Sequence, residues 1–284
     1  FSQAASLAYK DNDWAFGFKE SWVGENYNPE TGYVPRVNYI QTQLDAAKNF
    51  YPKNKSTNVF YTTLSAMTMS YWNNQGTFTD NTTYVAYEGT MKDRSTFGAY
   101  LSYDYVKLLY DFDATRMGNT ALKKGTEHDW YALNARYSSS PIKLFTYTLS
   151  SRFGGYYGQG WRTGITADIG YRFQPYGSFS VAVDYNDIVE VTIPGTDVVA
   201  AKKVSSNFWI IRPKIDITFS NKLFFATFFQ LNQQTKNVNL NARLQWRYKP
   251  ASDLFLVYTD NYFPEIMQIR NRALVLKLNY WLNL

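Results

Sequence analysis

The sequence contains no cysteine, only one histidine (His128), and no long apolar run. Without cysteine the chain cannot form disulfides or thiolate metal sites, and a single histidine makes a histidine-based metal centre improbable, so we expect no metal and no cofactor. A helix that crosses a bilayer needs ~20 consecutive apolar residues, and the densest apolar stretch, Leu223 to Phe229, is about one third of that length. These absences argue against a helical membrane protein and against a metalloprotein.

Aromatic residues are abundant: 25 Tyr, 20 Phe and 8 Trp make up 19% of the 284 residues, beside 18% charged residues. Tyr and Trp suit a membrane–water boundary, because the ring is apolar while the hydroxyl or N–H still finds a polar partner. The net charge is +6, but Lys and Arg are scattered along the chain and do not cluster. We therefore expect no nucleic-acid partner.

The apolar residues alternate with polar ones over several long segments, which indicates β-strands with one face of each kind. The clearest series run from Trp161 to Phe173, Phe179 to Tyr185, Trp209 to Phe219 and Val238 to Tyr248. These runs exceed the ~5 to 6 residues usual for a soluble strand and are long enough to cross a bilayer at a tilt. Alternation alone also fits a soluble β-sandwich. The lengths of the connections between the strands must therefore distinguish a sandwich from a membrane barrel.

Short turns and longer loops alternate between the expected strands, as in bacterial barrels whose long loops lie outside the cell. We place turns at 10–13, 92–95, 138–141, 174–177, 220–222 and 249–252, and longer loops at 24–36, 111–127, 187–206 and 260–272. The chain ends in an alternating series, Leu274, Leu276, Leu278, Tyr280, Leu282 and Leu284. This last series is similar to the terminal strand of outer-membrane barrels.

The fold class that we predict is all-β: a transmembrane antiparallel barrel in the outer membrane of a Gram-negative bacterium, with about 15 strands visible. Because bacterial barrels have even strand numbers, we expect at least one further strand upstream of Phe1. Residues 1–284 would then be the C-terminal part of a barrel domain. Ser2–Tyr9 should not pair directly with Ala273–Leu282.

Three segments, residues 24–36, 252–258 and 271–277, resemble a Bacteroidota outer-membrane β-barrel family of unknown function. The likeness runs over nearly the whole chain. Members of that family are much longer, and the barrel usually follows a family-9-like carbohydrate-binding domain. The resemblance implies a carbohydrate-related role at the cell surface, but it assigns no catalytic or binding residues.

Charged residues at alternate strand positions are predicted to point into the lumen. They are Arg136, Arg162, Asp168, Arg172, Asp184, Arg212, Lys214, Asp216, Arg243, Arg247 and Lys277. A basic lumen would favour anionic solutes. Alternatively, cross-strand pairs of Arg with Asp would only satisfy a filled or plugged lumen.

One loop motif stands out for its turn residues: Asn26, Tyr27, Asn28, Pro29, Glu30, Gly32 and Arg36. Asn28-Pro29 favours a turn and Gly32 permits positive φ, so the segment is either a recognition loop or, as we favour, a loop packed on the rim. We expect Arg36 to pair with Glu25 or Glu30.

His128, followed by Asp129, raises the question of a barrel hydrolase, but we expect a solvated residue at a loop end and no enzyme activity. The aromatic residues at 156–157, 161 and 261–264 lie at loop ends, where exposed rings could form a sugar-binding platform; we favour girdle residues.

The function that these observations predict is passage or surface handling of solutes, with transport of glycans as the resemblance-based guess. The alternative is a plugged, structural or partner-binding barrel subunit of an outer-membrane complex. Expected partners are the lipid bilayer, lipopolysaccharide and other outer-membrane proteins or lipoproteins.

Overall fold

The computed structural model describes residues 1–30, 32, 34–54, 56–195, 200–265 and 268–282. Its strands are β1 (Ser2–Lys10), β2 (Trp14–Val23), β3 (Tyr39–Phe50), β4 (Val59–Trp72), β5 (Phe78–Met91), β6 (Thr96–Lys107), β7 (Glu127–Ser138), β8 (Phe145–Tyr156), β9 (Gly160–Phe173), β10 (Gly177–Ile193), β11 (Lys202–Thr218), β12 (Leu223–Asn232), β13 (Asn237–Lys249), β14 (Ser252–Phe263) and β15 (Gln268–Leu278). Within these ranges the only helical segment is η1 (Tyr157–Gln159), and no helix is long and apolar enough to cross a membrane.

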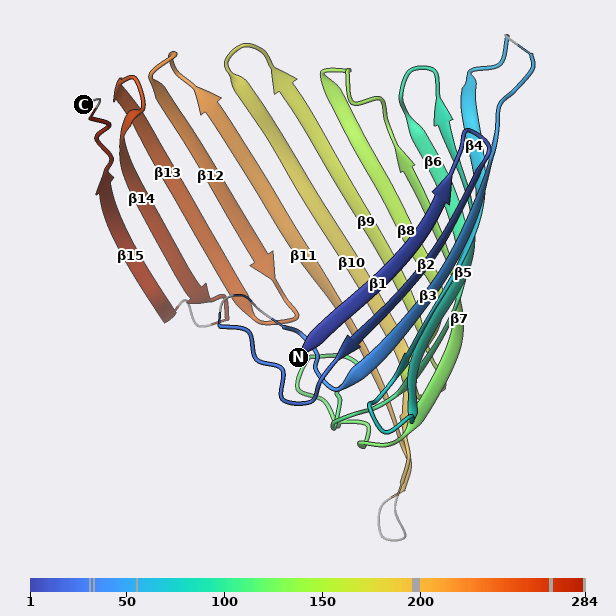
Figure 1. Ribbon diagram of the computed structural model, residues 1–284. Coiled ribbons are helices and arrows are strands. Elements are labelled where there is room, and N and C mark those ends of the chain that lie inside the picture. The colour runs from blue at the N-terminus through green and yellow to red at the C-terminus, as the bar shows by residue number, and fades with distance from the viewer. Residues whose placement is uncertain (31, 33, 55, 196–199, 266–267, 283–284) are drawn as a thin grey trace. The chain divides into compact units, whose positions relative to one another are not determined.

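All fifteen strands belong to one sheet, and their order in the sheet is their order in the sequence. Each strand is hydrogen-bonded to the next one along the chain. Figure 1 shows these consecutive strands side by side. The pairs for which the register is described are antiparallel. The all-β class and the expected strand number are therefore confirmed. In the described residues β1 and β15 end the sheet order and do not pair with each other, so the sheet is not closed.

The sheet divides into two compact units. Unit 1 comprises residues 1–137, 151–163 and 188–206, and unit 2 comprises residues 138–150, 164–187 and 207–284. Strands β8 to β11 contribute one end to each unit.

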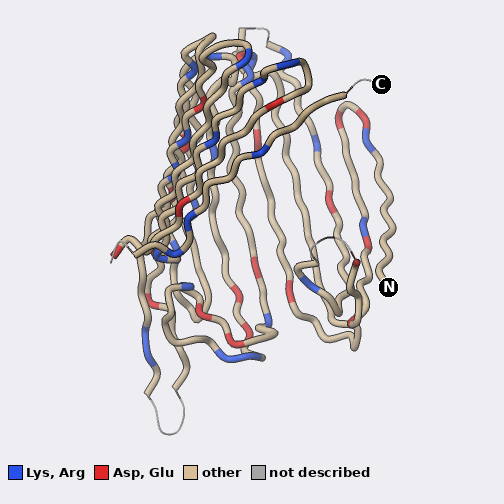
Figure 2. Tube along the Cα trace, turned by 90° about the vertical axis from the view of Figure 1, so that its left-hand side faces the viewer, with Lys and Arg blue, Asp and Glu red and all other residues tan. Residues whose placement is uncertain are grey.

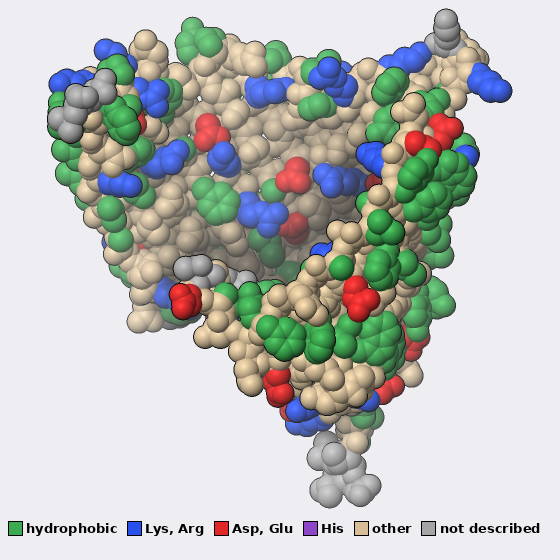
Figure 3. Space-filling view, in the orientation of Figure 1, with side chains coloured by type: hydrophobic (Ala, Val, Ile, Leu, Met, Phe, Trp, Pro, Cys, Tyr) green, Lys and Arg blue, Asp and Glu red, His purple; other side chains and the backbone are tan. Residues whose placement is uncertain are grey.

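Unit 2 has one apolar and one polar face, which follows directly from the alternation in its strands. Leu244 of β13 lies beside Leu256 of β14, and Leu256 beside Leu276 of β15. These three side chains are 36%, 40% and 68% exposed, so no second layer covers the apolar face here. The polar face carries Asp184, Arg212, Asp216 and Arg243, and Figure 3 shows charged side chains gathered over β10 to β12.

Unit 1 has the same division. Phe16 and Phe18 of β2 lie on one face with Leu44 of β3, which is the partner of Phe18, and the three side chains are 47%, 38% and 51% exposed. Hydrophobic side chains also cover this face of β1 to β3 in Figure 3. The opposite face holds polar side chains such as Gln43 and Asp45, which share a hydrogen bond of 3.2 Å.

The connections only partly follow the expected asymmetry. All six predicted short turns join strands in the structure. The loops predicted at 187–206 and 260–272 are shorter in the structure. β10 extends to Ile193 and β11 begins at Lys202, and only residues 264–267 lie between β14 and β15. The eight-residue connection 51–58 was not predicted, and it lies at the end of the sheet that carries the short turns.

The last strand is shorter than the alternation predicted. β15 ends at Leu278, and Asn279 still exchanges two backbone hydrogen bonds with Asp253, at 2.8 and 3.1 Å. Trp281 then donates its backbone N–H to Ser252 Oγ at 2.9 Å, which draws the chain out of the ladder. The prediction that this strand runs to the end of the chain is therefore wrong for residues 279–282, which lie outside β15. Leu284 lies outside the described residues.

Candidate functional site on the polar face

The polar face of unit 2 is organised around ion pairs between neighbouring strands. Arg212 Nη2 of β11 lies 2.5 Å from Asp184 Oδ2 of β10, and Thr166 of β9 donates to Asp184 Oδ1 at 2.8 Å. The Asp184 side chain is only 18% exposed. Both of its oxygens are thus satisfied, as a partly buried carboxylate requires.

Three further predicted lumen charges take part in ion pairs, one pair within a strand and one between strands. Lys214 lies 2.8 Å from Asp216, two residues along β11. Arg247 of β13 lies 3.3 Å from Asp253 of β14, and Gln245 donates to the same oxygen at 3.0 Å. Asp253 was not predicted as a lumen charge, because it is the second residue of β14. Only the register shows that it lies opposite Arg247.

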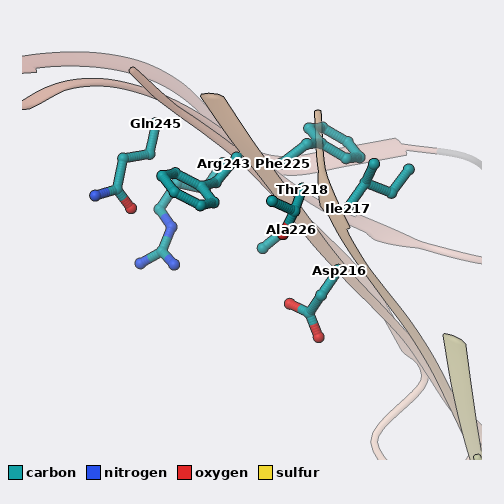
Figure 4. A pocket seen from close by; sticks show the side chains of 8 residues that line it. Asp216, Ile217, Thr218, Phe225, Ala226, Arg243 and Gln245 are labelled. Atoms are coloured by element: carbon teal, nitrogen blue, oxygen red, sulfur yellow. The ribbon is translucent and has the colours of Figure 1, made fainter. Parts of the chain in front are cut away.

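Arg243 differs from these residues. It has no hydrogen bond or ion pair to any of the described residues, although it lies on the same face. It lines a shallow pocket of about 210 Å³ together with Asp216, Thr218, Phe224, Ala226 and Gln245, and with Ile217 and Phe225. Figure 4 shows Arg243, Gln245 and Asp216 extending from one side of the strands, whereas Ile217 and Phe225 extend from the other.

Among the remaining predicted lumen charges, two contact other groups and three are exposed. Arg172 donates to the carbonyl oxygens of Pro141 and Lys143, so it fastens the 139–144 turn. Arg162 lies over the ring of Tyr156, 5.5 Å from its centroid. Arg136, Asp168 and Lys277 are exposed. Figure 2 shows that cations and anions are interspersed along the trace.

Arg36 fastens the 24–38 loop to the polar face of unit 1. Its Nη1 lies 2.7 Å from Asp80 Oδ2, its Nη2 donates to Thr79 Oγ1 at 2.7 Å, and its guanidinium lies 4.9 Å from the centroid of Tyr71. The expected pair with Glu25 or Glu30 is therefore wrong, because Asp80 of β5 offers a carboxylate that is only 28% exposed. An ion pair that is partly buried beside an aromatic ring is stronger than one that is fully exposed to water.

The rest of the loop motif is less firmly held. Tyr27 donates its backbone N–H to the carbonyl of Gly24 at 3.3 Å, and Gly32 has a φ of 103°. Asn26, Asn28, Pro29 and Glu30 have no hydrogen bond or ion pair to the described residues. Of this motif the structure thus brings only Arg36 into an ion pair with the polar face, and its partner Asp80 is not one of the predicted lumen charges.

The residues around His128 form a packed aromatic cluster, which consists of Phe112, His128, Trp130, Tyr156 and Tyr157. Ring centroids lie 4.7 Å apart for Trp130 and Tyr157, and 4.9 Å apart for Phe112 and Tyr157. Burial raises the pKa of Tyr157 to about 12. Tyr156 and Tyr157 therefore differ from the expected girdle residues, because their rings pack on one another and on the 108–126 loop, whereas Trp161 is 49% exposed.

His128 is partly buried in this cluster and is not a freely solvated residue. Its Nδ1 accepts the backbone N–H of Gly158 at 3.2 Å, so Nε2 carries the proton and donates to Thr126 Oγ1 at 2.9 Å. Both ring nitrogens are occupied by structural partners. In the described residues no carboxylate is hydrogen-bonded to the ring, which leaves the arrangement of a hydrolase triad unformed.

Asp113 organises the 108–126 loop. Its carboxylate accepts backbone N–H groups of Thr115, Gly118 and Asn119 at 2.8 to 2.9 Å, besides the hydroxyl of Thr115 at 2.7 Å. Burial by itself would raise the pKa of Asp113, but these hydrogen bonds outweigh it and hold the pKa below its ordinary value.

The described residues contain no group of three or more His, Cys, Asp or Glu side chains that could hold a metal ion. Comparison with protein-family models, with curated proteins and with solved structures found no match to this chain.

Proposed function

We propose that this sheet is part of the wall of a transmembrane β-barrel in the outer membrane of a Gram-negative bacterium, and that small solutes pass along its polar face. The observation that carries the proposal is the pairing of an uncovered apolar face with a polar face of cross-strand ion pairs. In water, rows such as Leu244, Leu256 and Leu276 would be a large exposed apolar patch, whereas in a bilayer they contact lipid.

The strand lengths support the same proposal. Strands β3 to β14 have 10 to 17 residues, and a strand that crosses the hydrocarbon core at a tilt needs about 9 to 11. The edges of β1 and β15 would leave backbone groups unpaired in hydrocarbon. The proposed barrel is therefore closed by further strand pairing at both edges. Lipid and lipopolysaccharide contact the apolar face, and other outer-membrane proteins or lipoproteins are candidate partners.

Planar-bilayer recording on the purified protein tests passage directly. Steady conductance steps that vanish after heat denaturation are the expected result, and the absence of any conductance in a folded, membrane-inserted sample would contradict the proposal. Sugars added as conductance blockers would test the glycan-related role that the sequence resemblance suggests.

A plugged structural barrel is the second candidate, and one observation favours it. Arg36 holds the 24–38 loop against the polar face of unit 1 through its ion pair with Asp80. If that loop obstructs passage, the wild-type protein will be silent in the bilayer and an Arg36→Ala variant will conduct. If neither conducts, the lumen is filled by other means and the structural role is favoured.

A further inference from the structure

The pocket beside Arg243 arises from a break in a row of phenylalanines. On the polar face of β12, Phe224, Ala226 and Phe228 occupy alternate positions, so the small side chain of Ala226 stands between two rings. Ala226 is the direct neighbour of Asp216 on β11 and of Arg243 on β13. The pocket therefore has a floor at Ala226, an aromatic wall at Phe224, and one charged residue on each flanking strand.

The two charged residues at the pocket are not equivalent. Asp216 is neutralised by Lys214 at 2.8 Å. Arg243 has no such partner among the described residues, whereas Arg212 and Arg247 on the same face each have one. The pocket consequently presents a net positive charge at Arg243, and a guanidinium binds a carboxylate through two parallel hydrogen bonds.

We infer that this pocket binds a small carboxylate-bearing solute with an apolar ring or chain. The carboxylate contacts the Arg243 guanidinium, and the apolar part occupies the space above Ala226 against the ring of Phe224. The size agrees, because about 210 Å³ accommodates a molecule of roughly ten non-hydrogen atoms but not an extended polymer. The inference deepens the proposed function, on which it rests for its biological meaning, by naming the class of solute that passes.

Binding to the detergent-solubilised, folded protein tests the inference without requiring passage. The probe is 4-fluorobenzoate, whose fluorine resonance broadens on binding, and the neutral probe of the same shape is 4-fluorobenzamide. We expect the benzoate to bind and the amide to bind at least about tenfold more weakly, because only the carboxylate forms the charge-assisted pair. Equal affinity of the two probes would overturn the assignment.

Three variants locate the site. Arg243→Gln should weaken benzoate binding by about tenfold, and Arg243→Lys by less, because lysine keeps the charge but loses the planar fork. Ala226→Leu should weaken binding at least as much as Arg243→Gln, because the larger side chain fills the floor of the pocket while every charge remains. The matched control is Lys277→Gln, which removes an exposed cation from the β15 polar face without touching the pocket.

An equal loss of binding in Lys277→Gln would mean that a diffuse positive field attracts the anion, which would overturn the inference. So would unchanged binding in Arg243→Gln. Failure of the proposed function has a different signature: benzoate binds and Arg243→Gln weakens its binding about tenfold, but the protein does not conduct.

Discussion

A charge on the apolar face should prevent stable insertion, and Leu244→Arg is the sharpest such change. Leu244 lies near the middle of β13, beside Phe225 and Leu256, and is 36% exposed on the proposed lipid face. An arginine on the lipid face near the bilayer midplane costs about 2 to 4 kcal/mol, which lowers the folding equilibrium constant by about 30- to 800-fold. We expect this loss in urea titrations of folding into phosphatidylcholine vesicles.

The matched control places the same side chain on the other face. Ala182→Arg in β10 introduces an arginine two residues from Asp184, hence on the polar face, where a cation has a carboxylate nearby and no lipid to enter. We expect this variant to fold with a free energy within about 1 kcal/mol of wild type, as other substitutions on an already polar surface do. Equal destabilisation by the two arginines, or none by Leu244→Arg, would refute the assignment of the faces.

Three further changes test the polar contacts. Arg36→Ala leaves the partly buried Asp80 carboxylate without its cation and should cost about 1 to 3 kcal/mol locally, so limited proteolysis should cut the 24–38 loop faster than in wild type; an unchanged rate would contradict the anchor. The lowered pKa of Asp113 means that its contribution to stability is full above the ordinary value of about 3.9 and is lost as the pH falls through the folded pKa. The protection factors of amides in the 108–126 loop, which correct for the pH dependence of intrinsic exchange, should therefore fall on acidification in wild type but not in Asp113→Asn. Arg212→Ala should lower the free energy of unfolding of unit 2 in urea by about 1 to 3 kcal/mol, because the Asp184 carboxylate keeps only its hydrogen bond from Thr166. Replacing both Arg212 and Asp184 by leucine should recover part of that loss.

The alternation of residue types predicted most of the sheet. In β13, Val238 to Tyr248 alternate strictly with polar residues, and the structure places the two sets on opposite faces. The same rule failed to separate the faces of β12, because Phe224 and Phe228 lie on the polar face while Phe225 and Phe229 lie on the apolar one. The pocket at Ala226 was therefore hidden in what looked like a uniform apolar run.

Strand ends were predicted less well than strand centres. The β10–β11 hairpin continues past the predicted strand end, with Lys203 paired to Glu190 at 3.2 Å and the Glu190 N–H donated to Ser205 Oγ at 2.9 Å. Its residues Ile188, Val191 and Ile193 are buried, but Glu190 has a φ of 56° and shifts the alternation by one residue, so the period of two is interrupted in the sequence. Arg36 was misassigned for another reason: its partner Asp80 lies 44 positions along the chain, and only the strand register brings the two together.

The central claim, that one face of the sheet contacts lipid and the other contacts water, is tested most directly by spin labels along β14 in vesicles. The chain has no cysteine, so a single introduced cysteine is the only site that a label can occupy. Labels at 254, 256 and 258 should collide mainly with oxygen, and labels at 255, 257 and 259 mainly with a water-soluble nickel complex, giving an accessibility that alternates with a period of two. If both sets are equally accessible to the nickel complex, β14 lies in water and the sheet is not the wall of a membrane barrel.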